Sequence, residues 1–147
     1  DFAAADPAEL EGLIRSTGFY RSKARSIREM AAAVVRDFGG KVPATMAELL
    51  TLRGVARKTA NVILSTAYGK SEGIVVDTHM KRVAFRLGLT RRTDPVQVER
   101  DLMACVTKAD WNFFGIAMVW HGRRLCPARK PRCGQCPMSE YCPKRGG

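Results

Sequence analysis

The sequence lacks the features that would place it in a membrane or among disulfide-stapled secreted proteins. No segment of the 147 residues reaches the roughly 20 consecutive apolar residues that span a bilayer. The opening residues, DFAAADPAEL, have neither the basic head nor the apolar stretch of a signal peptide. The 5 cysteines are odd in number, and all but one lie between residues 126 and 142, too close together to staple distant elements. We therefore expect an intracellular protein with no membrane partner and with a metal at its cysteines.

Negative charge is also scarce. Asp and Glu together number 14 against 25 Lys and Arg, which gives a formal net charge of +11 and a pI near 10.0. Such a balance is the electrostatic footprint of a nucleic-acid binder, although an anionic lipid surface or an acidic protein would also satisfy it. The charge therefore narrows the partner to an anionic one.

The clean two-residue alternation of β-strands is absent, and helix signals take its place. Capping residues, helical spacing of apolar residues and glycine stops mark the helices. They predict helices that start at Asp6-Pro7, run from Arg21 to Phe38, start at Thr45 with Glu48, start at Asp94-Pro95 and run from Trp111 to Leu125. The predicted fold class is all-α.

The stretch from Leu50 to Tyr68 is typical of a helix-hairpin-helix. A short helix ends, Gly54-Val55-Ala56 makes a tight turn, and a new helix begins near Arg57. Such a turn aims backbone N–H groups at one point beside a helix N-terminus, where they bind a phosphate without reading the base. The residues alone also fit an ordinary helix corner that uses glycine for a positive φ.

The cysteines of the C-terminal segment have the spacing C-x6-C-x2-C-x5-C at Cys126, Cys133, Cys136 and Cys142. Zinc sites usually pair C-x2–4-C knuckles, and only one such knuckle is present, whereas four thiolates are what a [4Fe–4S] cluster requires. The spacing alone leaves zinc open. Cys105 lies in the apolar-rich run DLMACV and is predicted to be a buried core thiol.

Several motifs together resemble the endonuclease III family: LRGVARKTANVIL, then VVDTH, then HGRRLC and CPARKPRCGQCPMSEYC. The resemblance covers nearly the whole chain. It implies a helix-hairpin-helix glycosylase fold with a partial helical barrel domain at residues 1–71, the hairpin at about 50–68, and a helical iron–sulfur cluster domain at 72–147 with its cluster loop at 126–142. It also implies that a [4Fe–4S] cluster, rather than zinc, is the cofactor.

The resemblance assigns catalysis to Lys58 and Asp77. Lys58 takes the place of the family's nucleophile, whose amine displaces a damaged base and forms a Schiff base with the sugar. Only the neutral amine attacks, so the site must favour loss of its proton. Asp77 is predicted to cap the following helix, and in the family the matching carboxylate also stabilises positive charge on the sugar and helps to move protons.

The DNA-binding residues are predicted in two places. The hairpin contributes Arg53, Gly54, Val55, Ala56 and Arg57, and the loop between the first two cluster cysteines contributes Arg129, Lys130 and Arg132. A basic loop fixed at both ends loses less entropy when it binds phosphates.

The hairpin departs from the family pattern. Leu52-Arg53-Gly54-Val55-Ala56 stands where the family usually has Leu-Pro-Gly-Val-Gly. A left-handed Ala56 would cost on the order of 1–2 kcal/mol.

The resemblance predicts a bifunctional base-excision glycosylase and abasic-site lyase that removes oxidised pyrimidines from duplex DNA containing damaged bases or abasic sites. We expect a monomer associated with DNA in a bacterial cytoplasm or nucleoid. The sequence has no initiating Met and begins inside what resembles the family's third helix. A truncated or non-catalytic DNA-binding module is therefore an alternative, as are a monofunctional mismatch glycosylase, which Lys58 disfavours, and a zinc-stabilised interaction domain.

Overall fold

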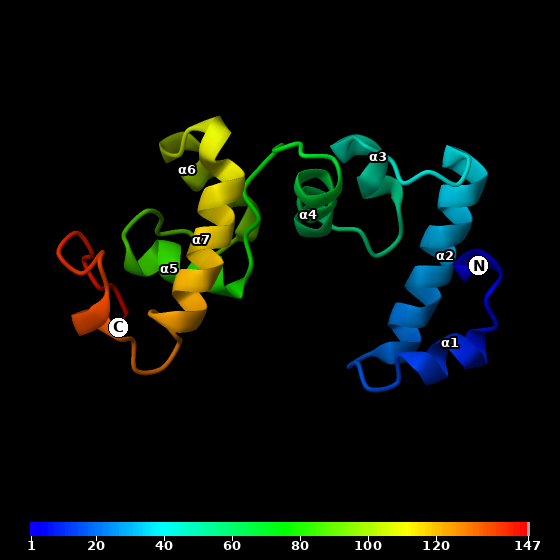
Figure 1. The fold of residues 1–147 in the computed structure, drawn as a ribbon, viewed down its shortest axis with the longest axis horizontal. Coiled ribbons are helices and arrows are strands. Elements are labelled where there is room, and N and C mark those ends of the chain that lie inside the picture. Colours follow the sequence, from blue (N-terminus) through cyan, green and yellow to red (C-terminus); the bar gives the residue numbers. More distant parts are fainter. Residues whose placement is uncertain (147) are drawn as a thin grey trace. The chain divides into compact units, whose positions relative to one another are not determined.

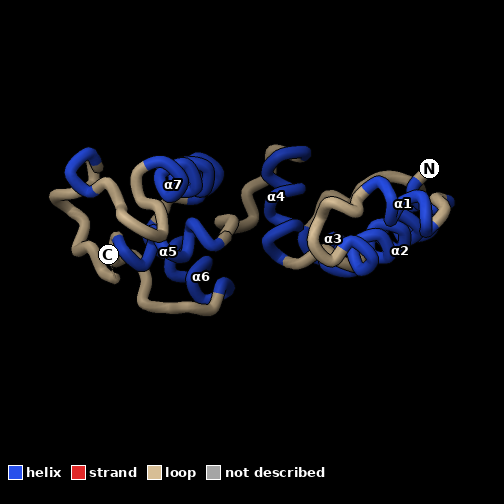
Figure 2. The backbone as a smooth tube through the Cα atoms, turned by 90° about the horizontal axis from the view of Figure 1, so that it is seen from below, coloured by secondary structure: helices blue, strands red, loops and turns tan. Residues whose placement is uncertain are grey.

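The computed structural model describes residues 1–146, which fold into helices joined by turns (Figures 1 and 2). No strand occurs among the described residues, so the predicted all-α class is confirmed. The α-helices are α1 (Pro7–Leu13), α2 (Tyr20–Phe38), α3 (Met46–Thr51), α4 (Arg57–Ala67), α5 (Thr78–Arg86), α6 (Pro95–Cys105) and α7 (Trp111–Arg124). Three short 3₁₀ turns are η1 (Phe2–Ala4), η2 (Lys108–Asp110) and η3 (Cys133–Gln135).

The chain divides into two compact units, Asp1–Ala60 and Asn61–Gly147. The first unit holds α1, α2, α3 and the start of α4, and the second holds the rest of α4 and the later helices. The predicted boundary between the barrel domain at 1–71 and the iron–sulfur cluster domain at 72–147 stays a prediction. Within residues 1–146, no helix has both the length and the apolar character needed to cross a membrane.

The helix starts follow the predicted capping residues. Asp6 Oδ1 accepts hydrogen bonds from the N–H groups of Ala8 and Glu9, both at 2.9 Å, and Pro7 opens α1. Thr45 Oγ1 accepts from the N–H of Glu48 at 3.3 Å at the start of α3. These side chains satisfy donors that the first turn of a helix leaves unpaired, which is why such sequences begin helices.

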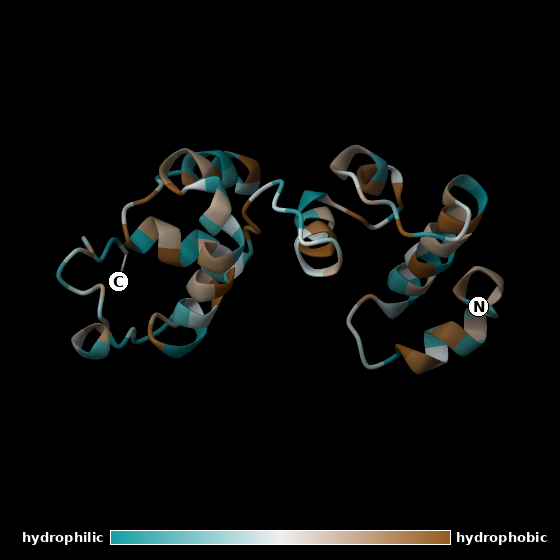
Figure 3. Cartoon of the chain, turned by 45° about the horizontal axis from the view of Figure 1, so that its top comes forward, coloured by the Kyte–Doolittle hydropathy of each residue, from teal (hydrophilic) through white to brown (hydrophobic). Residues whose placement is uncertain are grey.

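Each unit buries its own apolar side chains, and the helices mix hydrophilic with hydrophobic residues, as Figure 3 shows. An amphipathic helix of this kind packs its apolar face inward. The first unit buries Leu10, Ala24, Leu49, Leu52, Val55 and Ala60. The second has a core cluster of Ile74, Met80, Val83, Ala84, Val98, Leu102, Trp111 and Met118.

The prediction that Cys105 is a buried core thiol is wrong. Cys105 is exposed at the last residue of α6, and its Sγ donates to the carbonyl of Leu102 at 3.3 Å. Val98 and Leu102, four residues apart on α6, supply the buried face. Val106, four residues after Leu102, packs against the core in place of Cys105.

Candidate nucleic-acid interface and iron–sulfur site

The hairpin turn between α3 and α4 is held by two buried apolar residues. Leu52 and Val55 are 4% and 7% exposed, and the N–H of Val55 donates to the carbonyl of Leu52 at 3.1 Å. Gly54 supplies the left-handed conformation with φ of 80°. Ala56 is not among the described residues with positive φ, so the strain considered for it does not arise. The chain therefore forms the turn without the family's second glycine.

The turn packs closely on α2. A Cβ at Gly54 would lie 3.2 Å from the Cβ of Ser26, tighter than nearly all real contacts. Arg53 Nη1 donates to Glu29 Oε2 at 2.6 Å, and Arg25 Nε donates to Glu29 Oε1 at 2.8 Å. Glu29 therefore bridges α2 to the hairpin, and Arg53 has a protein partner, which its sequence position did not indicate.

Lys58 is exposed in the first turn of α4. Its neighbour Arg57 is half-buried, and the carbonyl of Ala56 accepts from the N–H of Ala60 at 3.0 Å, so helical pairing starts immediately after the turn. The free N–H groups and partial positive charge of a helix start lie at this end of α4. An accessible amine thus follows the hairpin turn directly, while phosphate binding at the turn stays a prediction.

Asp77 is half-buried at the start of α5, in the second unit. Its Oδ1 accepts from the N–H of Met80 at 2.8 Å, which confirms the predicted N-cap. The cap fixes the carboxylate at a helix N-terminus, where negative charge is stabilised. Lys58 belongs to the first unit.

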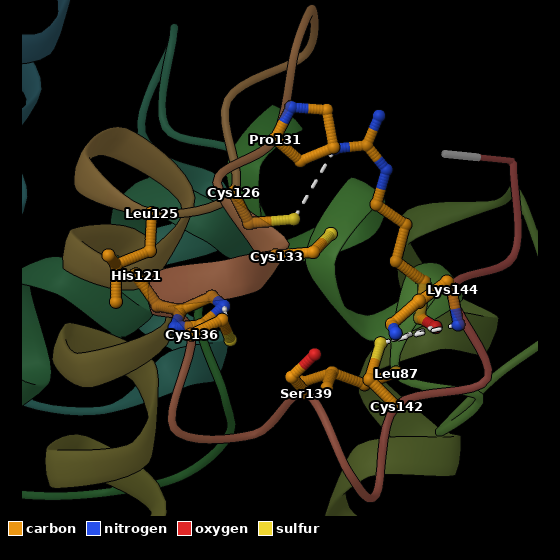
Figure 4. Close-up of a pocket in the computed structure, with 11 residues that line it drawn as sticks. Leu87, His121, Leu125, Cys126, Pro131, Cys133, Cys136, Ser139, Cys142 and Lys144 are labelled. Atoms are coloured by element: carbon orange, nitrogen blue, oxygen red, sulfur yellow. Dashed lines mark hydrogen bonds between the residues drawn. The ribbon is translucent and has the colours of Figure 1, made fainter.

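The predicted cluster cysteines line one cavity. Cys126, Cys133, Cys136 and Cys142 line the same hollow (Figure 4), and none of the four forms a disulfide. Among residues 1–146, no three His, Cys, Asp or Glu side chains meet as ligands of a single ion. Four thiols spread around one hollow suit a multi-atom iron–sulfur group better than one zinc ion.

Hydrogen-bond donors support the sulfur atoms. Arg86, only 7% exposed, donates from Nη1 to Cys126 Sγ at 3.3 Å and to the carbonyl of Pro127 at 2.7 Å. Its Nη2 reaches the carbonyl of Ala128 at 3.0 Å, and the N–H of Lys144 donates to Cys142 Sγ at 3.3 Å. Donors of this kind stabilise thiolates and orient them, so the donor set fits an anionic cluster.

His121 also lines this cavity, with its Nε2 3.8 Å from Cys136 Sγ. Burial lowers the pKa of His121, because desolvation disfavours the charged imidazolium. The sequence offered no role for this residue. The structure places it as a neutral wall of the cysteine cavity.

The predicted basic loop is accessible. Arg129, Lys130 and Arg132 are all exposed, and Lys130 has a positive φ of 54°. The N–H of Arg132 donates to the carbonyl of Leu125 at 2.8 Å, which ties the loop back to the end of α7. Together with the bonds from Arg86, this contact holds both sides of the loop while its charges face solvent.

Comparisons with known proteins agree with this geometry. Residues 1–108 match the model of the HhH-GPD superfamily of base excision DNA repair proteins, and residues 126–142 match the iron–sulfur binding domain of endonuclease III. The chain belongs to the endonuclease III family. The matched iron–sulfur domain also confirms the predicted [4Fe–4S] cofactor.

Two relatives within the endonuclease III family illustrate the similarity. Endonuclease III of Synechocystis is 52% identical over 96% of this chain and 64% of its own length. Endonuclease III of Bacillus subtilis is 43% identical over 97% of this chain and 65% of its own length. The chain therefore spans about two thirds of the length of these relatives.

Solved structures of the family show the same fold. A trapped covalent endonuclease III–DNA intermediate has a TM-score of 0.92 and 41% identity, and a non-covalent endonuclease III–DNA complex has a TM-score of 0.91 and 42% identity. Each comparison covers 97% of this chain and 67% of the other. The predicted helix-hairpin-helix glycosylase fold is thus confirmed.

Sequence reasoning missed Arg82 and Arg86 on α5. Arg82 donates to the carbonyls of Gly122 at 2.9 Å and Cys126 at 3.1 Å. The two arginines are four residues apart, so they share one face of the helix. That spacing was visible, but nothing in the sequence showed that this face meets the cluster loop.

Sequence reasoning also missed Phe19. It is 89% exposed and immediately precedes α2 with a left-handed φ of 57°. For a bulky residue this conformation is strained, and strain of this kind gathers at functional sites. The available sequence signal was the aromatic pair after Gly18, which lies just before the helix predicted from Arg21.

Proposed function

We propose that this chain is a base-excision DNA glycosylase with abasic-site lyase activity, which removes oxidised pyrimidines from duplex DNA. The observation that carries the proposal is the exposed Lys58 in the first turn of α4, directly after the hairpin turn. The family membership and the formal charge of +11 support DNA as the partner. The relatives' structures with DNA are consistent with this partner.

Lys58 acts as the nucleophile in the proposed reaction. Its neutral Nζ bonds to the anomeric carbon of the sugar while the bond to the damaged base breaks, and the base leaves with the electron pair. Ring opening gives an imine, which acidifies the adjacent sugar carbon. Loss of a proton from this carbon expels the 3′ phosphate by β-elimination. The strand therefore breaks without an oxidant or a reductant.

Asp77 acts as the electrostatic and proton-transfer partner. Its carboxylate stabilises the positive charge that develops on the sugar as the base leaves. The hydrogen bond from the N–H of Met80 fixes its position. The same carboxylate exchanges protons with the amine or the leaving group.

The hairpin and the cluster loop hold the substrate. The N–H groups around Gly54, Val55 and Ala56 bind a backbone phosphate, with Arg57 beside them. The exposed loop residues Arg129, Lys130 and Arg132 supply a further basic contact. Neither contact reads a base. Both should therefore position the DNA whatever the sequence around the lesion.

The four cysteines of the cavity are the proposed ligands of the [4Fe–4S] cluster. When bound, the cluster supplies a structural crosslink between the segments that carry Cys126 and Cys142. The bonds from Arg86 hold the first ligand and the two following carbonyls, so that the basic loop keeps one conformation.

Phe19 is the proposed filler of the gap that an extruded nucleotide leaves. A glycosylase must rotate its target out of the stack at a cost of a few kcal/mol, which an inserted apolar side chain helps to offset. Phe19 is the most exposed of the large hydrophobic side chains in residues 1–146. Phe19→Ala is expected to slow excision from duplex DNA more than lyase action at a preformed abasic site.

Borohydride trapping tests the central proposal. The protein is incubated with duplex DNA that holds one abasic site, and reduction of the imine leaves a covalent adduct. Wild type and Lys41→Ala, which removes an exposed lysine elsewhere in the same unit, should form the adduct, whereas Lys58→Ala should not. Bound DNA without an adduct in the wild type would favour a non-catalytic binding module.

Asp77→Asn separates the charge of the aspartate from its cap. Asn is as good an N-cap as Asp, so the variant should keep α5 intact. Excision should fall by about 10²–10⁴-fold if the carboxylate moves protons or stabilises charge. Unchanged excision with unchanged stability would leave Asp77 as a cap only.

A further inference from the structure

Arginines gather in a hollow of the first unit. The hollow is open to solvent, and its charged lining consists of Arg21, Arg25, Arg28, Arg53, Glu11 and Glu29. The four arginines exceed the two glutamates by two positive charges. No lysine lines it, and arginine is the residue that binds phosphate oxygens through paired N–H donors.

Glu29 organises this hollow. Its two oxygens accept from different arginines, Arg25 at 2.8 Å and Arg53 at 2.6 Å. The hydrogen bonds from these arginines hold the pKa of Glu29 below its ordinary value, so its charge is kept near neutral pH. One carboxylate thus arranges two guanidinium groups that together carry twice its charge.

The arginines retain unused hydrogen-bonding capacity. Each guanidinium has five N–H donors, and Arg25 and Arg53 use one each on Glu29. Arg28 lines the same hollow, and its buried Nε has no hydrogen-bond partner among residues 1–146. The guanidinium donors that remain available can therefore serve an anionic ligand in the hollow.

We infer that this hollow is a second backbone-phosphate site, which binds the DNA strand beside the phosphate held by the hairpin turn. The inference rests on the proposed function for its partner. Arg53 belongs to the hairpin turn itself and precedes Gly54, so one residue connects the two sites. A continuous phosphodiester strand can occupy both, whereas a free anion would fill only one.

The salt dependence of DNA binding tests the inference. Affinity for duplex DNA with a stable abasic-site analogue is measured by fluorescence anisotropy between about 50 and 200 mM salt. Each lost phosphate contact should reduce the slope of log affinity against log salt by about one. We expect this reduction for Arg25→Ala and for Arg53→Ala, and a larger one for the double variant.

Arg36→Ala is the matched control. Arg36 is also an exposed arginine of α2 and pairs with Asp37 at 2.6 Å, but it lies outside the hollow. Its removal changes the net charge by the same amount, and the slope should stay at the wild-type value. Arg53→Lys, which keeps the charge, should keep most of the slope and lose affinity. This variant guards against a folding defect.

Two outcomes would overturn the inference alone, and a third would refute the proposed function with it. Equal slopes for Arg53→Ala and Arg36→Ala in a folded protein would refute the second phosphate site. Formation of the Lys58 adduct would be unaffected by that result. Inorganic phosphate that raises the melting temperature of wild type but not of Arg53→Ala, with unchanged DNA slopes, would make it a free-anion site. No DNA binding by wild type would refute the proposed function as well.

Discussion

The hairpin turn at residues 52–56 and the cluster loop at 126–142 are both irregular segments, but they are built from different materials. The hairpin is short, joins two helices directly and rests on the buried Leu52 and Val55. The cluster loop has no fully buried residue along its length, and its regular structure is limited to the 3₁₀ turn at Cys133–Gln135.

Only one of these two segments is expected to need a cofactor for its shape. Apolar burial and a permitted backbone conformation are properties of the polypeptide alone, so the hairpin should hold its shape without a cofactor. The cluster loop is held by donors from Arg86, its thiols are the proposed cluster ligands, and ligand binding contributes directly to the folding free energy of such loops. Variants that remove a cluster ligand should therefore disturb the cluster loop and leave the hairpin intact, and variants of the buried apolar residues should do the reverse.

Loss of one cluster ligand should have the largest effect. Cys133→Ala is expected to abolish iron binding, and hydrogen exchange should then show unprotected amides through residues 126–142. The N–H of Val55, bonded within the hairpin, should keep its protection. Absorbance, iron analysis and exchange mass spectrometry provide the measurements. Cys105→Ala is the control and should retain iron, because Cys105 lies outside the cavity.

Truncation of a buried apolar side chain should instead destabilise the unit that holds the hairpin. Leu49, in α3, is 0% exposed, so Leu49→Ala should lower the free energy of unfolding of the first unit by about 2–5 kcal/mol. Its neighbour Leu50 is 45% exposed, and Leu50→Ala should change stability by no more than about 0.5 kcal/mol. Urea denaturation followed by circular dichroism measures both. Similar losses in the two variants would contradict the assigned burial.

A methyl group on Gly54 should lower both the stability of the hairpin and its affinity for DNA. Gly54→Ala should cost about 1–2 kcal/mol of stability, because its φ is 80°. Its Cβ also approaches Ser26, so the turn must shift and DNA affinity should fall. Gly39→Ala has a similar φ of 59° with no atom within 4 Å, and it should lose stability while keeping DNA affinity. Equal affinities for the two variants would contradict a phosphate site at the turn.

The smallest effect concerns the ion pairs of Glu29. The arginines lower its pKa in the folded state, so their stabilisation is present above the unfolded pKa near 4.5 and is lost as pH falls through the folded value. The melting temperature of wild type should exceed that of Glu29→Gln slightly at neutral pH. The gap should close as acid protonates Glu29, and it should shrink in high salt because the group is exposed. A difference in melting temperature that persists in acid would show that Glu29 stabilises the protein by packing and not by its charge.

The sequence predicted local features well because their causes are local. Asp6, Asp77 and Thr45 cap helices through atoms within three residues, and Gly54 takes the positive φ that a tight turn requires. The spacing of the cysteines likewise reflects the ligand needs of one loop. Such signals do not depend on how distant segments pack.

The features that sequence reasoning missed depend on contacts between distant segments. Arg86 reaches Pro127 across 41 residues, and Arg53 reaches Glu29 across 24. No short-range pattern encodes such a pairing. The prediction for Cys105 failed for a related reason, because apolar neighbours in the sequence did not reveal which face of α6 the core would take.

The exposure of Cys105 allows the fraction of molecules that carry the cluster to be measured by thiol labelling. A thiol reagent that cannot enter the cysteine cavity should label one sulfur per molecule when the cluster is in place, and all 5 after the metal has been stripped under denaturing conditions. The ratio of the two readings gives the loaded fraction of a preparation without any iron measurement. The same sulfur offers a single attachment point for a fluorophore on α6, away from the hairpin turn and the cluster loop in the sequence.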